Sequence, residues 1–484
     1  PAMSAPKPSP SSDRSSDGAS KHSQGRGIPR DKAEAERQQL RTLAAQGYAE
    51  AQYDLGVMFL QGLGGPKDEV EARRLFRLAA AQGHAGAQYN LGLMNEEGRG
   101  GPKDEVEARR LYGLATAQGY AEAQHNLGLM HDEGRGGPKD EVEARRLFGL
   151  AAAQGLAGAQ HNLGFMHQQG RGGPKDEVEA RRLYGLAAAQ GFADAQNNLG
   201  LMYLSGLCGP KDEAEARRLF SLAAAQQQAA AQYHLAVMLV QGRGGPKDEV
   251  EARRLYGLAA AQGLAKAQFN LGLMHEEGLG GPKDEVEARR LYGLAAAQGH
   301  SGAQYNLGVM HQQGRGGPKD EVEMRRLFRL AAAQGLAGAQ HNLGVMHQQG
   351  QGGQKDDVEA RRLFRLAAAQ GLAESQYSLG FMHADGRGGP KDEAEARRLY
   401  GLAAAQGLAK AQNNLGLMHE EGRGGPKNEA EARRLYGLAA AQGLAESQYS
   451  PGVMHEEGRN GPKVEAEARR LFRLAAAQGI PIES

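Results

Sequence analysis

The sequence predicts an all-α fold, a right-handed αα-superhelix (solenoid) built from twelve 36-residue helix-turn-helix repeats. The first observation is length, because 484 residues are too many for one globular core. The second is a repeat that never slips in register. A glutamine preceded by Ala or Ser returns every 36 residues, at Gln52, Gln88, Gln124, Gln160, Gln196, Gln232, Gln268, Gln304, Gln340, Gln376, Gln412 and Gln448.

The first half of each repeat has the pattern of a short helix, called helix A below. In the repeat at residues 121–156, Leu127, Met130 and His131 fall on one face at helical spacing. Gly134 follows this face and is placed to end the helix, because glycine adopts the left-handed conformation of a C-terminal cap.

The second half predicts another helix, helix B, after a Gly-Gly-Pro turn. Asp140 and Glu143 form a capping-box pattern, in which the aspartate accepts hydrogen bonds from the first backbone N–H groups. Glu141 and Arg145 have the spacing of a weak, exposed ion pair. Gly155 is placed to end helix B. The apolar positions of this helix are Ala144, Leu147, Phe148, Ala151 and Ala152.

The full repeat follows the pattern A-x-A-x-x-x-L-G-x-x-[H/Y]-x-x-G, then a Gly-rich turn with Asp, then E-A-x-x-L-[F/Y]-x-x-A-A-x-Q-G. This pattern resembles the Sel-1-like repeat, a relative of the tetratricopeptide repeat. The usual Trp of that family is Leu here, as at Leu147, and the usual Tyr is mostly His. The resemblance implies a superhelix with helix A on its concave surface, acting as an adaptor for multiprotein complexes.

The chain is predicted to have four parts. Residues 1–30 are rich in Ser and Pro and poor in large aliphatic residues, so they should form a disordered tail. Residues 31–47 resemble a lone helix B that caps the array, residues 48–482 hold the twelve repeats, and residues 483–484 are the C-terminal end.

Composition argues against several classes of protein. The 58 Lys and Arg residues against 57 Asp and Glu leave no basic excess for nucleic-acid binding. One cysteine, Cys208, cannot form an intramolecular disulfide and fits a reducing compartment. No stretch has the apolar length of a membrane span or a signal-peptide core. We therefore expect a monomeric, cytoplasmic protein, although a targeting signal could have preceded Pro1.

No catalytic constellation, metal site or cofactor site is predicted. An active site would occur once in the array and not in nearly identical units. A histidine ladder could suggest metal binding, but neighbouring helices lie too far apart for two imidazoles to share an ion, so packing is favoured. The ladder is His131, His167, His275, His311, His347, His383, His419 and His455.

The GRGG sequence between the two helices also has two interpretations. It lacks the GK[ST] end of a phosphate-binding loop, and its fixed place between helices favours a structural turn. Weak RNA binding through its arginines is the alternative.

A variable stripe on the side of helix A opposite its packed face is the predicted partner-binding surface. Its aromatic and aliphatic residues would anchor a segment of another protein, and its asparagine amides would bond the partner backbone. Two alternatives stay open: the stripe is buried between successive helices A, or the array is a structural spacer without a dedicated ligand. The predicted residues are Tyr89, Asn90, Leu93, Asn126, Leu129, Asn162, Phe165, Phe269, Asn270, Tyr305, Asn306, Val309, Asn342 and Val345.

Overall fold

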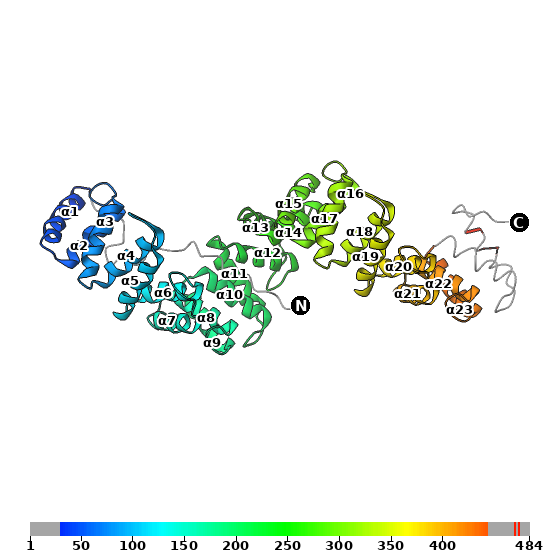
Figure 1. Cartoon of the computed structure of the whole chain (residues 1–484), viewed down its shortest axis with the longest axis horizontal. Helices are drawn as coiled ribbons and strands as arrows, with labels where there is room; N and C mark the ends of the chain where they lie inside the picture. Colours follow the sequence, from blue (N-terminus) through cyan, green and yellow to red (C-terminus); the bar gives the residue numbers. More distant parts are fainter. Residues whose placement is uncertain (1–29, 444–468, 471–472, 475–484) are drawn as a thin grey trace. The chain divides into compact units, whose positions relative to one another are not determined.

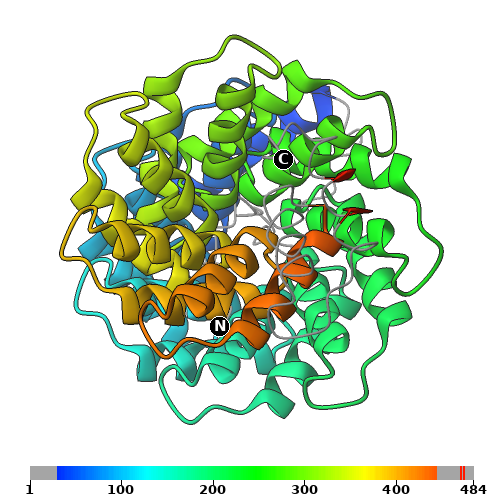
Figure 2. The same ribbon diagram turned by 90° about the vertical axis from the view of Figure 1, so that its right-hand side faces the viewer.

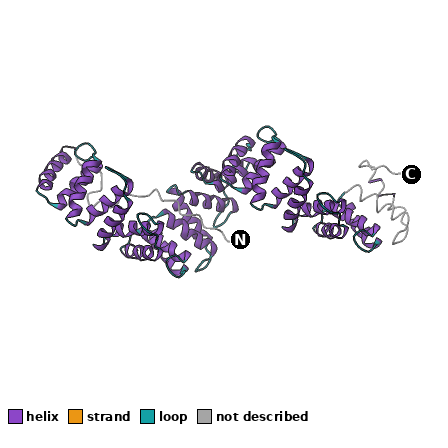
Figure 3. Cartoon of the chain, in the orientation of Figure 1, coloured by secondary structure: helices purple, strands orange, loops and turns teal. Residues whose placement is uncertain are grey.

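The structure is a computed structural model that describes residues 30–443, 469–470 and 473–474. Twenty-three α-helices and no strand occur in this part of the chain (Figure 3). The fold class predicted from the repeat is thus confirmed for the described residues. They divide into two compact units between Lys247 and Asp248, in the turn of the sixth repeat.

The first unit contains twelve helices, and each packs against the next in chain order (Figures 1 and 2). Helices with even numbers are helices A, and those with odd numbers are helices B. Their bounds are α1 Arg30–Ala45, α2 Ala49–Gln61, α3 Glu69–Ala81, α4 Ala85–Glu97, α5 Glu105–Ala117, α6 Ala121–Glu133, α7 Glu141–Ala153, α8 Ala157–Gln169, α9 Glu177–Ala189, α10 Ala193–Ser205, α11 Glu213–Ala225 and α12 Ala229–Gln241.

The second unit repeats the same arrangement. Its helices are α13 Glu249–Ala261, α14 Ala265–Glu277, α15 Glu285–Ala297, α16 Ser301–Gln313, α17 Glu321–Ala333, α18 Ala337–Gln349, α19 Asp357–Ala369, α20 Ala373–Asp385, α21 Glu393–Ala405, α22 Ala409–Glu421 and α23 Glu429–Ala441.

Helix boundaries follow from capping residues in the repeat. Asp140 Oδ1 accepts hydrogen bonds from the backbone N–H groups of Val142 and Glu143. Equivalent Asp or Asn residues cap the other helices B from α3 to α23. Gly134 ends α6 in the left-handed conformation, with a φ of 74°. The predicted start of helix B and end of helix A are therefore correct.

In every described hairpin except that of repeat 6, which has Ala236, a glycine lets the two helices approach closely. A Cβ added at Gly128 of α6 would lie 2.8 Å from a ring carbon of Phe148 in α7. Phe148 is 2% exposed, and Leu147 and Ala144 beside it are fully buried. Small residues on helix A thus make room for the aromatic ring of helix B.

The recurring glutamines connect three helices at once. Gln88 in α4 is 4% exposed, and its Nε2 donates to the carbonyl oxygen of Ala80 in the preceding α3. Its Oε1 accepts a 2.8 Å hydrogen bond from Nε2 of Gln118, at the end of α5. The same two bonds recur along both units, for example at Gln304 and Gln340. Buried amides therefore hold successive repeats in register.

Helix α1 occupies the segment expected to cap the array. Leu40 and Leu43 of this helix pack against the first core cluster, and Ala44 belongs to it. The predicted tail before Arg30 and the predicted C-terminal end lie outside the described residues. In the described part of the chain, no helix is both long and apolar enough to cross a membrane.

Candidate protein-binding surface

The predicted stripe on helix A lies at the junctions between repeats and is mostly half-buried. Val309 and Tyr305 pack against the core cluster that contains Phe328, and the rings of Tyr305 and Phe328 are 5.7 Å apart. Tyr89 is 8% exposed and lies between Tyr112 and Tyr120, so it belongs to the core. The half-buried members are Asn90, Leu93, Asn126, Leu129, Asn162, Phe165, Phe269, Asn270, Tyr305, Asn306, Val309, Asn342 and Val345.

Several stripe asparagines bond neighbouring repeats. Asn162 Nδ2 lies 3.0 Å from His125 Nε2 on the preceding helix A. Asn270 Nδ2 donates to the hydroxyl oxygen of Tyr256, at 3.2 Å. These amides consequently have part of their hydrogen-bonding capacity in use within the array.

The most exposed apolar side chains lie on helix B, in what we call the outer ladder. Val142 is 68% exposed and Leu150 is 41% exposed. Every described helix B from α3 onward has a leucine at the position of Leu150, with nearly the same exposed fraction. The outer ladder comprises Val70, Leu78, Val106, Leu114, Val142, Leu150, Val178, Leu186, Leu222, Val250, Leu258, Val286, Leu294, Val322, Leu330, Val358, Leu366, Leu402 and Leu438.

The first arginine of the repeated Arg-Arg pair forms a clamp between repeats. Arg145 Nη1 donates to the carbonyl oxygens of Arg171 and Pro174 in the next turn, at 3.2 and 3.1 Å. Its Nη2 lies 2.8 Å from Nδ1 of His167. The predicted pair between Glu141 and Arg145 is therefore wrong, because the guanidinium gains more from several partly buried acceptors than from one exposed carboxylate.

The histidine ladder supplies the acceptor of this clamp in seven described repeats. A guanidinium group can only donate hydrogen bonds. The Nδ1 atom that faces it in each histidine must therefore be unprotonated and accept the bond. Burial and the neighbouring Arg145 lower the pKa of His167. The clamped histidines are His131, His167, His275, His311, His347, His383 and His419.

The GRGG turn packs directly on the preceding repeat. A Cβ added at Gly136, whose φ is 63°, would lie 2.2 Å from the carbonyl oxygen of Glu105. The turn arginines pair with acids: Arg171 Nη2 lies 2.5 Å from Asp132 and 2.9 Å from Glu141. These contacts explain the turn as a structural element. The ion pairs also neutralise the arginine charge that RNA binding would use.

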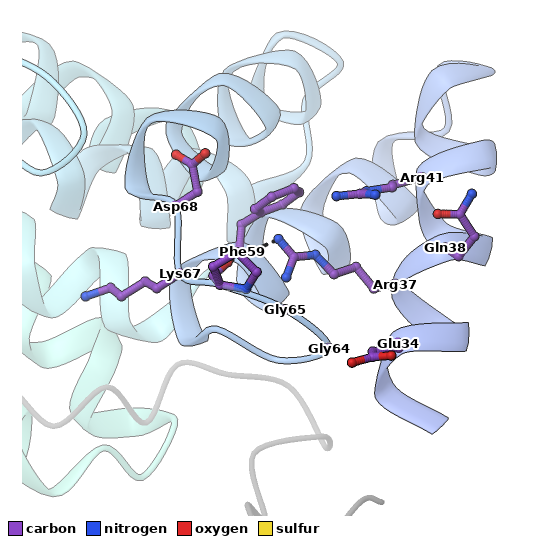
Figure 4. A pocket seen from close by; sticks show the side chains of 10 residues that line it. Glu34, Arg37, Gln38, Arg41, Phe59, Gly64, Gly65, Lys67 and Asp68 are labelled. Carbon is purple, nitrogen blue, oxygen red and sulfur yellow. Dashed lines mark hydrogen bonds between the residues drawn. The ribbon is translucent and has the colours of Figure 1, made fainter. Parts of the chain in front are cut away.

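A cavity of about 320 Å³ lies at the first repeat junction (Figure 4). Arg37 extends from α1 over the ring of Phe59, with its guanidinium carbon 3.8 Å from the ring centre. Phe59 stands where later repeats have the clamp histidine. Three cationic side chains, Arg37, Arg41 and Lys67, and two carboxylates, Glu34 and Asp68, line the same cavity. In the described residues, no cluster of three or more His, Cys, Asp or Glu side chains could hold a metal ion.

Sequence reasoning missed the clamp arginine and the roles of the glutamines. Both were visible as unvarying residues, since every repeat carries Arg-Arg and Ala-x-Ala-Gln. Their long-range partners were not visible, because the bonds join residues 22 to 30 positions apart in neighbouring repeats.

Comparison with known proteins agrees with this architecture. The Sel1 repeat family model matches twelve consecutive segments. They are residues 49–84, 85–120, 121–156, 157–192, 193–227, 229–264, 265–300, 301–336, 337–372, 373–408, 409–444 and 445–480. No protein of curated function matches the sequence.

Two solved structures are similar to this chain, and the first of them supports the same family. A protective antigen present in uropathogenic Escherichia coli strains, with an SLR fold, is 33% identical, with a TM-score of 0.74. The match covers 93% of this chain and 98% of the antigen. A Sel1 repeat protein from Oxalobacter formigenes is 30% identical over 62% of this chain and 87% of its own, with a TM-score of 0.48.

Sel1 repeat proteins generally serve as scaffolds for protein interactions, and their solenoids are typically not enzymes. Twelve matched segments and a helix pair in each described repeat leave one assignment: the chain belongs to the Sel1 repeat family.

Proposed function

We propose that this protein is a scaffold that binds segments of partner proteins along the helix A stripe. The observation that carries the proposal is the contrast between the two apolar surfaces. One stripe position differs from repeat to repeat, as Leu129, Phe165 and Val309 illustrate, whereas the outer ladder keeps the same Leu in each described helix B and has Val or Ala at its other position. A surface that distinguishes partners needs chemical variation along its length.

The partially exposed aliphatic residues of the stripe support this assignment. Leu273 and Leu417 occupy the same helix A position as Val309 in their own repeats and so extend the stripe, and Leu417 of α22 is 38% exposed. Such residues lose water-exposed apolar area when a partner covers them. We infer that α1 caps the array, that the tail before it is not part of the scaffold, and that the protein acts as a cytoplasmic monomer.

The test is an affinity capture with the intact chain and two matched triple variants. The stripe variant carries Leu273→Lys, Val309→Lys and Leu417→Lys, because lysine keeps an apolar stem and adds a charge at the surface. The ladder variant carries Leu294→Lys, Leu330→Lys and Leu438→Lys on helices B. Circular dichroism establishes that all three proteins are equally helical.

A partner protein retained by the intact chain and the ladder variant, but not by the stripe variant, is the expected result. Equal retention by all three would contradict the stripe proposal. If no protein is retained, the array is a spacer, and nucleic acid in the eluate would instead favour RNA binding by the turns.

A further inference from the structure

The arginine–histidine clamps are unevenly distributed along the array. Repeats 3 and 4 carry clamps at His131 and His167, and repeats 7 to 11 carry five more. At the other described junctions, the position of the clamp histidine holds a side chain that mild acid does not protonate. These side chains are Phe59 in repeat 1, Asn95 in repeat 2, Tyr203 in repeat 5 and Leu239 in repeat 6.

Protonation removes the acceptor on which the clamp depends. An imidazolium has two N–H groups and no lone pair, so His383 Nδ1 could no longer accept from Arg361 Nη2, 2.8 Å away. It would also place a second positive charge against the guanidinium. We propose that mild acid loosens the junctions of repeats 3–4 and 7–11, while repeats 1–2 and 5–6 stay closed, so that the array contains acid-labile and acid-resistant blocks.

The groups around a clamp histidine do not compensate for the added proton. His383 faces Arg361 of α19 and, from the start of α21, the carboxylates of Asp392 and Glu395. Glu395 is already paired with Arg398, at 2.7 Å. The net effect of burial and Arg361 is a lowered His383 pKa.

The remaining clamps have the same surroundings. The arginine comes from the preceding helix B, and the carboxylates come from the following helix B. These groups are Arg109, Asp140, Glu143 and Arg146 for His131; Arg145, Asp176, Glu179 and Arg182 for His167; Arg253, Asp284, Glu287 and Arg290 for His275; Arg289, Asp320 and Glu323 for His311; Arg325, Asp356, Glu359 and Arg329 for His347; and Arg397, Glu431 and Arg434 for His419.

The other described histidines leave the pattern of blocks unchanged. His300 and His341 lie in repeats 7 and 9, where burial lowers their pKa, so they belong to an acid-labile block. His125 and His161 lie in repeats 3 and 4, where burial lowers their pKa, and they add to the lability of that block. His84, at the end of repeat 1, does not lie at a clamp position, and its Nε2 lies 2.9 Å from Glu50 Oε2. His234 Nδ1 lies 2.9 Å from Asn197 Oδ1, an acceptor that a protonated ring can still use.

The sign of the effect follows from proton linkage. A group whose folded pKa lies below its unfolded value binds protons mainly in the open state. Closure is therefore fully favoured above the unfolded histidine pKa of about 6.5 and is lost as pH falls below it. Between pH 7.5 and pH 5.5, an opening that frees one clamp should become up to about tenfold more frequent.

Repeat 2 already has a residue at the clamp position that accepts the arginine bond and does not titrate. In repeat 2, Asn95 Oδ1 accepts from Arg73 Nη2 in the place of the histidine. The double variant His383→Asn and His419→Asn therefore keeps an acceptor at both junctions but cannot be protonated. Repeats 10 and 11 contain no other histidine.

The experiment is hydrogen exchange of the intact chain and the double variant at pH 7.5 and pH 5.5, corrected for the intrinsic pH dependence of exchange. In the intact chain, acid should lower protection across α19–α22 but not across α2–α4. In the variant the loss should vanish in α21–α22, diminish in α19–α20, where His341 Nδ1 still lies 2.9 Å from Ser375 Oγ, and persist in α14–α16. An undiminished acid response of α19–α22 in the variant would overturn the proposal.

A second measurement covers the case in which the variant is already destabilised at pH 7.5. NMR titration of ¹³C-labelled histidines in the intact chain should place His383 and His419 below the ordinary value. A pKa at or above about 6.5 for these two groups would overturn the proposal.

Discussion

Arg361 and Arg362 are adjacent in sequence, yet the structure predicts very different consequences when each becomes methionine. Arg361 is 4% exposed and donates to the carbonyl oxygens of Arg387 and Pro390 and to His383 Nδ1. Three bonds of about 1 kcal/mol each give a loss of about 3 kcal/mol. The side chain of Arg362 is 55% exposed and pairs only with Glu359, so its loss should be below about 1 kcal/mol.

Native-state hydrogen exchange measures this difference locally, which suits a repeat array that need not unfold in one step. A gap of about 2 kcal/mol corresponds to about 30-fold faster exchange in α19 and α20 for Arg361→Met than for Arg362→Met. Methionine retains the apolar stem, so packing changes little. Equal exchange in the two variants would refute the assignment of Arg361 as the inter-repeat clamp.

Three further predictions concern single positions. Gln227→Gly should raise the free energy of unfolding by about 1 kcal/mol, because Gln227 has a φ of 63° where other repeats have glycine, and an unchanged midpoint in urea would contradict this. Asp140→Ala should destabilise α7 by about 1 kcal/mol in thermal unfolding, whereas Asp140→Asn should be close to neutral, since Asn428 caps α23. NMR should place the pKa of His125 at about 4, because burial disfavours its charged form. Its proton then costs stability as pH falls below about 6.5, and a pKa near 6.5 would disprove the burial.

The repeat period and the capping residues made the fold predictable. Asp140, Gly134 and the apolar spacing of helix B are local signals, and the observed helix ends follow them. Pro451, which departs from the leucine of other repeats, lies outside the described residues.

Contacts between repeats were harder to predict, because they depend on how adjacent hairpins stack. The spacing of Glu141 and Arg145 satisfied a rule for isolated helices, but the arginine bonds the next turn instead. The burial of Tyr89 likewise depends on rings from the following helix B and from the residue that precedes the next helix A. Composition along one helix contains no information about such neighbours.

The most direct test of the scaffold proposal is site-specific photo-crosslinking in the presence of a captured partner. The photoreactive residue replaces either Leu417 of the helix A stripe or Leu438 of the outer ladder, which are 38% and 42% exposed. Matched exposure makes the two positions comparable. Crosslinks to the partner from position 417 and none from position 438 are the predicted result. Crosslinks from position 438 alone would contradict the proposal that helix A forms the binding surface.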